Sequence, residues 1–199
     1  MKAKFVYFDV GGVLVKDDRQ TAYRRFQEKH GYGSEFIDEL LHQYYIEANL
    51  GQVRSLAEYL KKYDLTFDGF GHEDVRAVLQ AHYELMFVDE EVVAIARSVQ
   101  ERAGVGIITN WEIAAIEWME RWGFTGDFNP IVISAAVGMV KPKREIYEHA
   151  VQLVGCRPSD IIFVDDKKEN VDGAEAVGMV GVVFRNADQL TRDLKTLLS

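Results

Sequence analysis

The stretch Phe5-Val6-Tyr7-Phe8-Asp9-Val10-Gly11-Gly12 joins an apolar run to an acidic residue and a pair of glycines. Its first half favours a β-strand buried on both faces, because the apolar residues are continuous rather than alternating with polar ones. Its second half ends that strand with residues suited to a phosphate group or a metal ion. The stretch therefore predicts a buried strand with functional residues at its carboxyl end.

Four more apolar runs resemble the first, at residues 105–109, 131–134, 161–164 and 180–184. Segments with apolar residues three and four positions apart predict helices, at residues 90–102, 113–122, 144–154, 170–177 and 187–198. Glycine, which favours the left-handed cap at a helix end, follows four of these segments, at Gly104, Gly123, Gly155 and Gly178. This alternation predicts an α/β fold, a Rossmann-like parallel five-stranded sheet with helices on both faces.

Residues 16–88 interrupt the alternation, since they contain several amphipathic segments and no convincing strand. Helices are predicted there at residues 21–30, 34–48, 55–63 and 73–87. We therefore predict a core domain made of residues 1–15 and 89–199, with residues 16–88 inserted as a helical cap. A cap inserted after the first strand would lie above the carboxyl ends of the strands, where open parallel sheets bind ligands.

Charge and composition exclude several classes of protein. The net charge of −9 over 199 residues argues against a surface that tracks nucleic-acid phosphates. No stretch approaches the roughly 20 apolar residues of a membrane span. The single cysteine, Cys156, cannot form an internal disulfide. Asp9 interrupts the apolar N-terminal run, so it does not read as a secretion signal. We expect a cytoplasmic monomer or homodimer.

Three further segments end or follow predicted strands with polar residues: Ile108-Thr109-Asn110, Val140-Lys141-Pro142 and Val164-Asp165-Asp166. The carboxylate of Asp9 is suited to nucleophilic attack on phosphorus. Asp165 and Asp166 offer the hard oxygen ligands that Mg²⁺ prefers. Thr109 can hydrogen-bond a phosphate, and Lys141 supplies a point charge. Together these segments predict transfer of a phosphoryl group.

These segments, in this order, resemble the haloacid dehalogenase-like superfamily, in the subgroup that inserts a helical cap after the first motif. The match rests on residues 8–14, on Gly138-Met139-Val140-Lys141-Pro142 and on residues 163–174. It is similar in particular to small sugar-phosphate phosphatases of the glucose-1-phosphate type and to the phosphatase domain of soluble epoxide hydrolases. The resemblance implies a Mg²⁺-dependent phosphatase that acts on a small phosphorylated molecule through an aspartyl phosphate.

The resemblance also implies roles for single residues. Asp9 would be the nucleophile and a metal ligand, together with Asp166 and the carbonyl oxygen of Gly11. Asp165 and Asn170 would orient the metal's waters or Lys141. The phosphate would be held by four residues, Thr109, Lys141 and the backbone N–H groups of Asn110 and Gly12.

Gly11 departs from the usual pattern of these phosphatases, which place an Asp two residues after the nucleophile. That Asp protonates the leaving alcohol and then deprotonates the attacking water. Such acid and base catalysis is typically worth about 10² to 10⁴ in rate. The sugar-phosphatase subgroup tolerates glycine there, and Asp17 or Asp18 could substitute.

Other readings stay open at the level of sequence. A binding protein with weak catalysis could keep the fold and the metal site without the second Asp. Cleavage of a carbon–halogen bond needs no metal, so the pair Asp165 and Asp166 speaks against it. Cleavage of a carbon–phosphorus bond needs a cap lysine, for which Lys29, Lys61 and Lys62 are available. The histidines show no metal-binding spacing, and Trp111, Tyr44 and Tyr45 are expected to serve packing.

Overall fold

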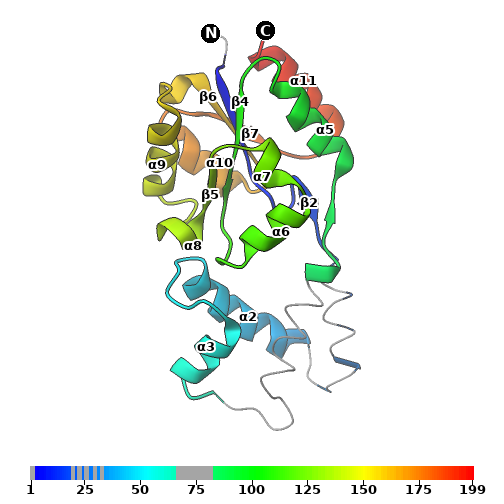
Figure 1. Cartoon of the computed structure of the whole chain (residues 1–199), viewed down its shortest axis with the longest axis vertical. Coiled ribbons are helices and arrows are strands. Elements are labelled where there is room, and N and C mark those ends of the chain that lie inside the picture. The colour runs from blue at the N-terminus through cyan, green and yellow to red at the C-terminus, as the bar shows by residue number, and fades with distance from the viewer. Residues whose placement is uncertain are drawn as a thin grey trace.

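The computed structural model describes residues 3–18, 21, 24, 27–28, 31, 34–65 and 83–199. Its main sheet has five parallel strands, β1 (Phe5–Phe8), β4 (Gly104–Thr109), β5 (Ile131–Ile133), β6 (Ile161–Asp165) and β7 (Val180–Val183). The strand order is β5-β4-β1-β6-β7, so β1 lies between β4 and β6. The predicted five-stranded parallel sheet is confirmed (Figure 1).

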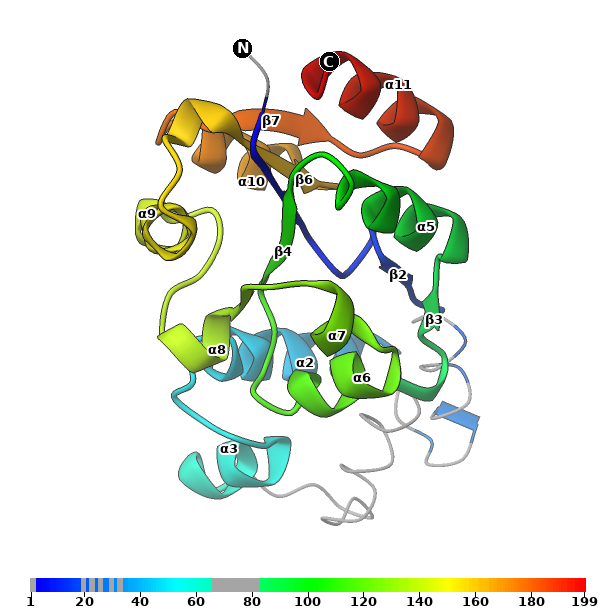
Figure 2. The same cartoon turned by 45° about the horizontal axis from the view of Figure 1, so that its top comes forward.

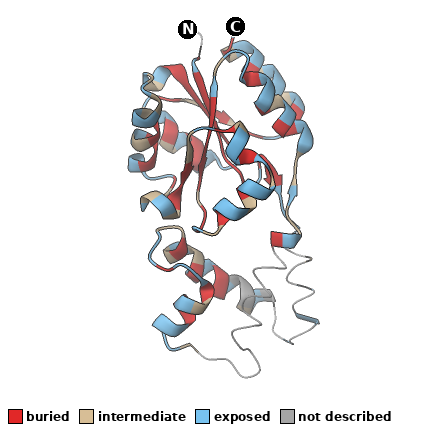
Figure 3. Ribbon diagram, viewed as in Figure 1, coloured by how far each residue is buried: buried red, intermediate tan, exposed pale blue. Residues whose placement is uncertain are grey.

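Helices cover both faces of this sheet, because the strand side chains are apolar on both sides. In β1, Val6 and Phe8 join one buried cluster and Phe5 and Tyr7 join another. The first cluster is covered by α5 (Glu90–Val99), α6 (Ala115–Arg121), α7 (Phe124–Asp127) and α11 (Ala187–Leu197). The second is covered by α9 (Arg144–Val154) and α10 (Lys168–Glu175). Figures 2 and 3 show these layers and the buried strands between them.

Two of the predicted cap helices lie within the described residues, as α2 (Ser34–Ala48) and α3 (Leu56–Lys62). They share a buried cluster of their own, separate from the two clusters of the sheet. In Figure 1 they lie beyond the same end of the sheet as α8 (Ser134–Val137). Residues 73–82 of the predicted helix at 73–87, and much of the one at 21–30, lie outside the described residues. At the end of the first of these, Tyr83 and Glu84 are helical as predicted, whereas Phe87 belongs to β3 (Phe87–Val88).

The expectation that residues 16–88 contain no strand is wrong at both ends of that segment. β2 (Val15–Lys16) pairs antiparallel with β3 (Phe87–Val88), and this ribbon lies where the chain leaves the sheet and returns to it. Two residues are too few to show an alternating pattern, so no sequence signal marked either strand. The four-residue helices α7 and α8 were not predicted for the same reason.

No helix in the described part of the chain is long and apolar enough to cross a membrane.

Candidate active site

The sheet brings three predicted site residues to one edge. Asp9 directly follows β1, while Thr109 is the last residue of β4 and Asp165 the last residue of β6. Because β1 pairs in parallel with both β4 and β6, the carboxyl ends of all three strands meet there. After β1 the chain forms β4 and β5 on one side of it and then crosses to form β6 and β7 on the other side. Open parallel sheets bind ligands at such a switch in strand order.

Lys141 reaches the same edge from the segment after α8 and lies between two carboxylates. Its Nζ is 2.8 Å from Oδ1 of Asp9 and 2.6 Å from Oδ2 of Asp165. All three side chains are buried. Burial by itself favours a neutral amine, but the two carboxylates outweigh it and raise the pKa of Lys141 above its ordinary value. Lys141 is therefore a fixed cation inside the site.

The side chain of Asp9 is held in place by its backbone surroundings and by Lys141. The backbone N–H of Val10 donates to Oδ1 at 2.7 Å, the same oxygen that Lys141 contacts. Within the described part of the chain no partner bonds Oδ2, so this oxygen is available to contact a ligand. Burial raises the pKa of Asp9 to about 6, although the charge and hydrogen bond of Lys141 lower it, and the charge of Asp165 adds to the rise.

Asp165 orients its neighbours, and its hydrogen bonds leave it little capacity for a ligand. Its carboxylate accepts hydrogen bonds from Nζ of Lys141, from Nδ2 of Asn170 at 3.0 Å to each oxygen, and from the backbone N–H of Lys167 at 2.8 Å. The side chain is completely buried. This arrangement suits the orienting role that the resemblance implied for Asp165 and Asn170.

The side chain of Asn110 has a position that the sequence did not suggest. Its Nδ2 donates to the backbone carbonyl of Lys141, and its Oδ1 accepts from the backbone N–H of Lys141, each at 2.8 Å. Two bonds to one residue fix the backbone of Lys141 relative to the end of β4. Sequence reasoning assigned only the backbone N–H of Asn110, because nothing in the chain indicates a pairing across 31 residues.

A metal ion fits the remaining oxygen atoms. Carboxylate oxygens of Asp9, Asp165 and Asp166 lie within 4.8 Å of one another. Burial, with the nearby charge of Asp165, raises the pKa of Asp166. Carboxylates crowded in this way repel one another, and a divalent cation with a preference for hard oxygen ligands relieves that repulsion. Asp9 and Asp166 would hold Mg²⁺, and the resemblance implies the carbonyl oxygen of Gly11 as a further ligand.

The glycine pair after Asp9 is asymmetric. Gly12 has a left-handed backbone with φ of 78°, and a Cβ added there would lie 2.6 Å from an oxygen of Asp166. Gly11 has no positive φ, and a Cβ added there would meet nothing within 4 Å. The structure thus requires glycine at position 12 and leaves room for a side chain at position 11.

Gly12→Ala is accordingly expected to lower catalytic activity by at least about 100-fold and to weaken binding of any divalent cation held by Asp166, since it strains the backbone and displaces Asp166. Gly11→Ala makes the same chemical change one residue earlier and is expected to alter activity by less than about threefold. Steady-state rates over a range of Mg²⁺ concentrations measure both. Equal effects of the two variants would contradict the conclusion that position 12 requires glycine and position 11 does not.

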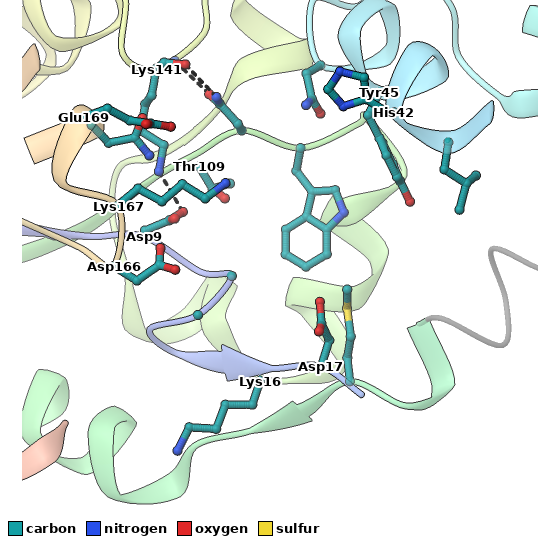
Figure 4. Close-up of a pocket in the computed structure, with 18 of the residues that line it drawn as sticks. Asp9, Lys16, Asp17, His42, Tyr45, Thr109, Lys141, Asp166, Lys167 and Glu169 are labelled. Carbon is teal, nitrogen blue, oxygen red and sulfur yellow. Dashed lines mark hydrogen bonds and ion pairs between the residues drawn. The ribbon is translucent and has the colours of Figure 1, made fainter. Parts of the chain in front are cut away.

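These residues open into a cavity of about 1210 Å³ between the sheet edge and α2. Figure 4 shows Asp9, Thr109, Lys141 and Asp166 on one side of it and His42 and Tyr45 on the other. The predicted site residues in its lining are Asp9, Gly11, Gly12, Asp17, Thr109, Asn110, Lys141, Asp166 and Asn170. Asp165 is buried behind them.

Several lining residues were missed by sequence reasoning. α2 contributes Glu35, Glu39, His42 and Tyr45 to the cavity, and Asn49, in the turn directly after α2, adds a further polar side chain. The spacing of His42, Tyr45 and Asn49 at three and four positions could have indicated one helix face, but the sequence did not show which face met the core. Asp17 reaches the lining, whereas the carboxylate of Asp18 accepts the backbone N–H of Thr21 at 3.1 Å. Tyr44 packs in the cap cluster as expected.

Comparison with known proteins agrees with this geometry. Residues 3–178 match the family model described as haloacid dehalogenase-like hydrolase. A sesquiterpene phosphatase of Aspergillus oryzae is 42% identical over 71 residues, 36% of this chain and 36% of that protein, so the match spans about a third of that relative. A glyceraldehyde 3-phosphate phosphatase of Methanopyrus kandleri is 26% identical over 208 residues, 92% of this chain and 84% of that protein.

Among solved structures, a haloacid dehalogenase family enzyme from Bacteroides thetaiotaomicron, in complex with magnesium and inorganic phosphate, matches with a TM-score of 0.75. The alignment covers 92% of this chain and 94% of that chain at 18% sequence identity, a level that shows a shared fold. The family match extends over most of the chain and contains Asp9, Thr109, Lys141 and Asp166. The resemblance that the motifs indicated is therefore confirmed, and the chain belongs to the haloacid dehalogenase-like hydrolase family.

Proposed function

We propose that this protein is a Mg²⁺-dependent phosphatase that hydrolyses phosphate monoesters of small metabolites through an aspartyl phosphate on Asp9. The observation that carries the proposal is the placement of Asp9 in the cavity lining with Nζ of the buried Lys141 at 2.8 Å. This arrangement pairs a nucleophile with a fixed cation that can neutralise the oxygens of a phosphoryl group.

In the proposed reaction, Oδ2 of Asp9 attacks phosphorus and the bond between phosphorus and the ester oxygen breaks. The ester oxygen leaves with the bonding electron pair and takes a proton from water to become the alcohol. Water then attacks the phosphorus of the aspartyl phosphate, which releases inorganic phosphate and restores the carboxylate. Lys141 and Thr109 hold the phosphate oxygens while the charge shifts. Mg²⁺, when bound, supplies charge neutralisation and alignment of the phosphoryl group.

The cap side of the cavity favours leaving groups without a second negative charge. In the described part of the chain, α2 contributes Glu35 and Glu39 to the lining but no lysine or arginine. The lining lysines are Lys16 in β2, Lys141 in the segment after α8 and Lys167 in the segment after β6. A second phosphate against α2 would face like charges, which is unfavourable. Monophosphates of neutral alcohols are therefore the substrates most compatible with the side of the cavity formed by α2.

A Mg²⁺-dependent screen over phosphorylated metabolites, with Asp9→Asn as the blank, tests the proposal. We expect release of phosphate from monophosphates of neutral alcohols and little from bisphosphates. Turnover that Asp9→Asn leaves unchanged would reject the proposed nucleophile, and a complete lack of turnover would favour a binding role for the same site.

Asp166→Ala is expected to raise the Mg²⁺ concentration needed for half-maximal activity by at least about tenfold. Asp166 has a carboxylate open to the cavity, whereas Asp165 is occupied by Lys141 and Asn170. Asp165→Ala should therefore lower kcat at saturating Mg²⁺ and change the Mg²⁺ requirement less. Activity titrated with Mg²⁺ for both variants separates these effects, and the reverse ranking would contradict the assignment.

Gly11→Asp is expected to raise turnover of alkyl phosphates by about tenfold or more, because it supplies an acid for the leaving alcohol. The wild type should then prefer aryl phosphates, whose leaving groups need little protonation. Position 11 has the space and the backbone conformation for a side chain. Rates on aryl and alkyl phosphates for the wild type, Gly11→Asp and Asp17→Asn show whether protonation of the leaving group limits turnover. Equal wild-type rates on both classes, unchanged by Asp17→Asn, would show that no carboxylic acid controls the leaving group.

The alternative hydrolytic reactions have less support. Full activity in excess chelator would favour cleavage of a carbon–halogen bond, which needs no metal. For cleavage of a carbon–phosphorus bond, Lys61 and Lys62 are exposed and outside the lining, and Lys62 pairs with Glu47 at 2.7 Å. Lys29 lies outside the described residues.

A further inference from the structure

Glu112 is a buried carboxylate for which the proposed chemistry has no use. It follows Trp111 in the segment after β4, and its exposed fraction is 2%. The phenol of Tyr44 donates a hydrogen bond to its Oε2, and the phenol of Tyr83 donates one to its Oε1. In the described part of the chain no lysine, arginine or histidine forms an ion pair with Glu112. Its two carboxylate oxygens are therefore stabilised by the hydrogen bonds from Tyr44 and Tyr83.

The two phenols belong to different parts of the molecule. Tyr44 lies on α2 and packs in the cap cluster, where its ring meets that of Tyr59 at 6.0 Å. Tyr83 belongs to the cluster on the sheet, where its ring stacks on Trp111 and on Trp118 at 6.0 and 5.1 Å. Glu112 thus joins the cap's buried cluster to the sheet's buried cluster, one carboxylate oxygen to each.

Burial makes this link strong. A buried carboxylate is costly unless each oxygen has a donor, and hydrogen bonds to a charged group are stronger than those between neutral groups. Burial, followed by the negative charge of Glu112, raises the pKa of both Tyr44 and Tyr83, so both phenols keep their protons and remain donors. Moving α2 away from the sheet edge would remove the donor from Oε2.

Both walls of the cavity are adjacent to this link. Tyr44 is flanked on α2 by His42 and Tyr45, which line the cavity opposite Asp9 (Figure 4). Glu112 directly follows Trp111, which also lines the cavity, and the indole Nε1 of Trp111 lies 3.0 Å from the phenol oxygen of Tyr83. A change at Glu112 would therefore alter where the leaving group can rest, while the carboxylates and Lys141 stay in place.

We propose that Glu112 is a positioning residue that clamps α2 to the phosphate-binding edge through Tyr44 and so sets selectivity among leaving groups. The selectivity part rests on the proposed phosphatase function, whereas the clamp itself does not. The clamp predicts that loss of one phenol oxygen, with its ring retained, loosens α2 specifically.

The test compares Tyr44→Phe with Tyr7→Phe, which removes another buried phenol hydrogen bond, to the carbonyl of Ala150 on the other face of the sheet. We expect Tyr44→Phe to speed amide hydrogen exchange in α2 by about tenfold, and Tyr7→Phe to leave it unchanged. Glu112→Gln should act as Tyr44→Phe does, and if it fails to fold, Tyr44→Phe carries the test alone. Unchanged exchange in α2 of Tyr44→Phe would overturn the clamp.

Selectivity gives a second measurement, using acetyl phosphate as the small substrate and 4-methylumbelliferyl phosphate as the large one. Tyr44→Phe should change the ratio of the two kcat/KM values by at least about fivefold, mainly through KM of the large substrate, while Tyr7→Phe preserves the ratio. An unchanged ratio together with faster exchange would overturn the selectivity role and keep the clamp. Absence of wild-type turnover on any phosphate would instead count against the phosphatase proposal, and exchange would still decide the clamp.

Discussion

Asp9→Asn is expected to lower the proposed phosphatase activity by at least about 10⁴-fold and to leave the fold intact. Asparagine has nearly the same shape as aspartate, and its amide oxygen can still accept from the N–H of Val10 and from Lys141, which contact Oδ1 at 2.7 and 2.8 Å in the wild type. An amide cannot attack phosphorus, so the aspartyl phosphate cannot form. Initial rates at saturating Mg²⁺ measure the loss, and the melting temperature reports on the fold.

Asp172→Asn is the matched control for this variant. It makes the same change on an exposed carboxylate of α10, which pairs with Nζ of Lys168 at 2.5 Å and lies outside the cavity lining. We expect its activity to stay within about twofold of the wild type. If Asp9→Asn kept more than a few per cent of the activity, the nucleophile would have to be another group.

The sequence predicted the sheet because its strands are buried on both faces. The apolar runs of β1, β4, β5, β6 and β7 are continuous, which is typical of strands buried on both faces. Of the four glycines predicted to end helices, Gly123, Gly155 and Gly178 have a left-handed backbone, whereas Gly104 is the first residue of β4. The sequence did not predict the ribbon of β2 and β3, because strands of two residues are too short to show a periodic pattern. Its existence depends on the pairing of Val15 with Val88 and of Lys16 with Phe87, residues far apart in the sequence, which a local pattern does not encode.

The placement of Asp9, Thr109 and Asp165 was likewise predictable, since parallel strands bring their carboxyl ends to one edge. The hydrogen bonds that hold the surrounding residues in place could not be predicted. Asn110 fixes the backbone of Lys141, and Glu112 joins two tyrosines, through contacts that arise only once the chain is folded. The polar face of α2 was visible as a helical pattern, but its orientation toward the cavity required the packing of the cap.

The buried triad of Asp9, Lys141 and Asp165 is expected to make Lys141→Met the most destabilising of these substitutions. Methionine keeps the length of the side chain but removes the cation between carboxylates whose exposed fractions are 6% and 0%. Breaking a buried ion pair by removing one partner typically costs about 3–5 kcal/mol, because the remaining charge is left without compensation. Activity should also fall by at least about 10³-fold, since the phosphoryl group loses its fixed cation.

The stability measurement should be made without divalent cations, which would neutralise the same carboxylates. For a chain of this size, a loss of this magnitude should lower the melting temperature by about 10 °C. Lys168→Met is the matched control, because Lys168 is exposed and its ion pair among the described residues is with the exposed Asp172. Such a pair contributes about 0–1 kcal/mol. Both variants remove one lysine charge, so a difference between them reports on burial.

A double variant separates charge from packing as the origin of this loss. Asp165→Asn, added to Lys141→Met, removes one of the two uncompensated carboxylates while keeping an oxygen that can accept from the N–H of Lys167 and from Asn170. We expect it to recover part of the lost stability and none of the activity, because the catalytic cation is still absent. If Lys141→Met proved as stable as Lys168→Met, the carboxylates of Asp9 and Asp165 would not both be charged in the folded protein, and the fixed ion pair on which the proposed phosphoryl transfer depends would be wrong.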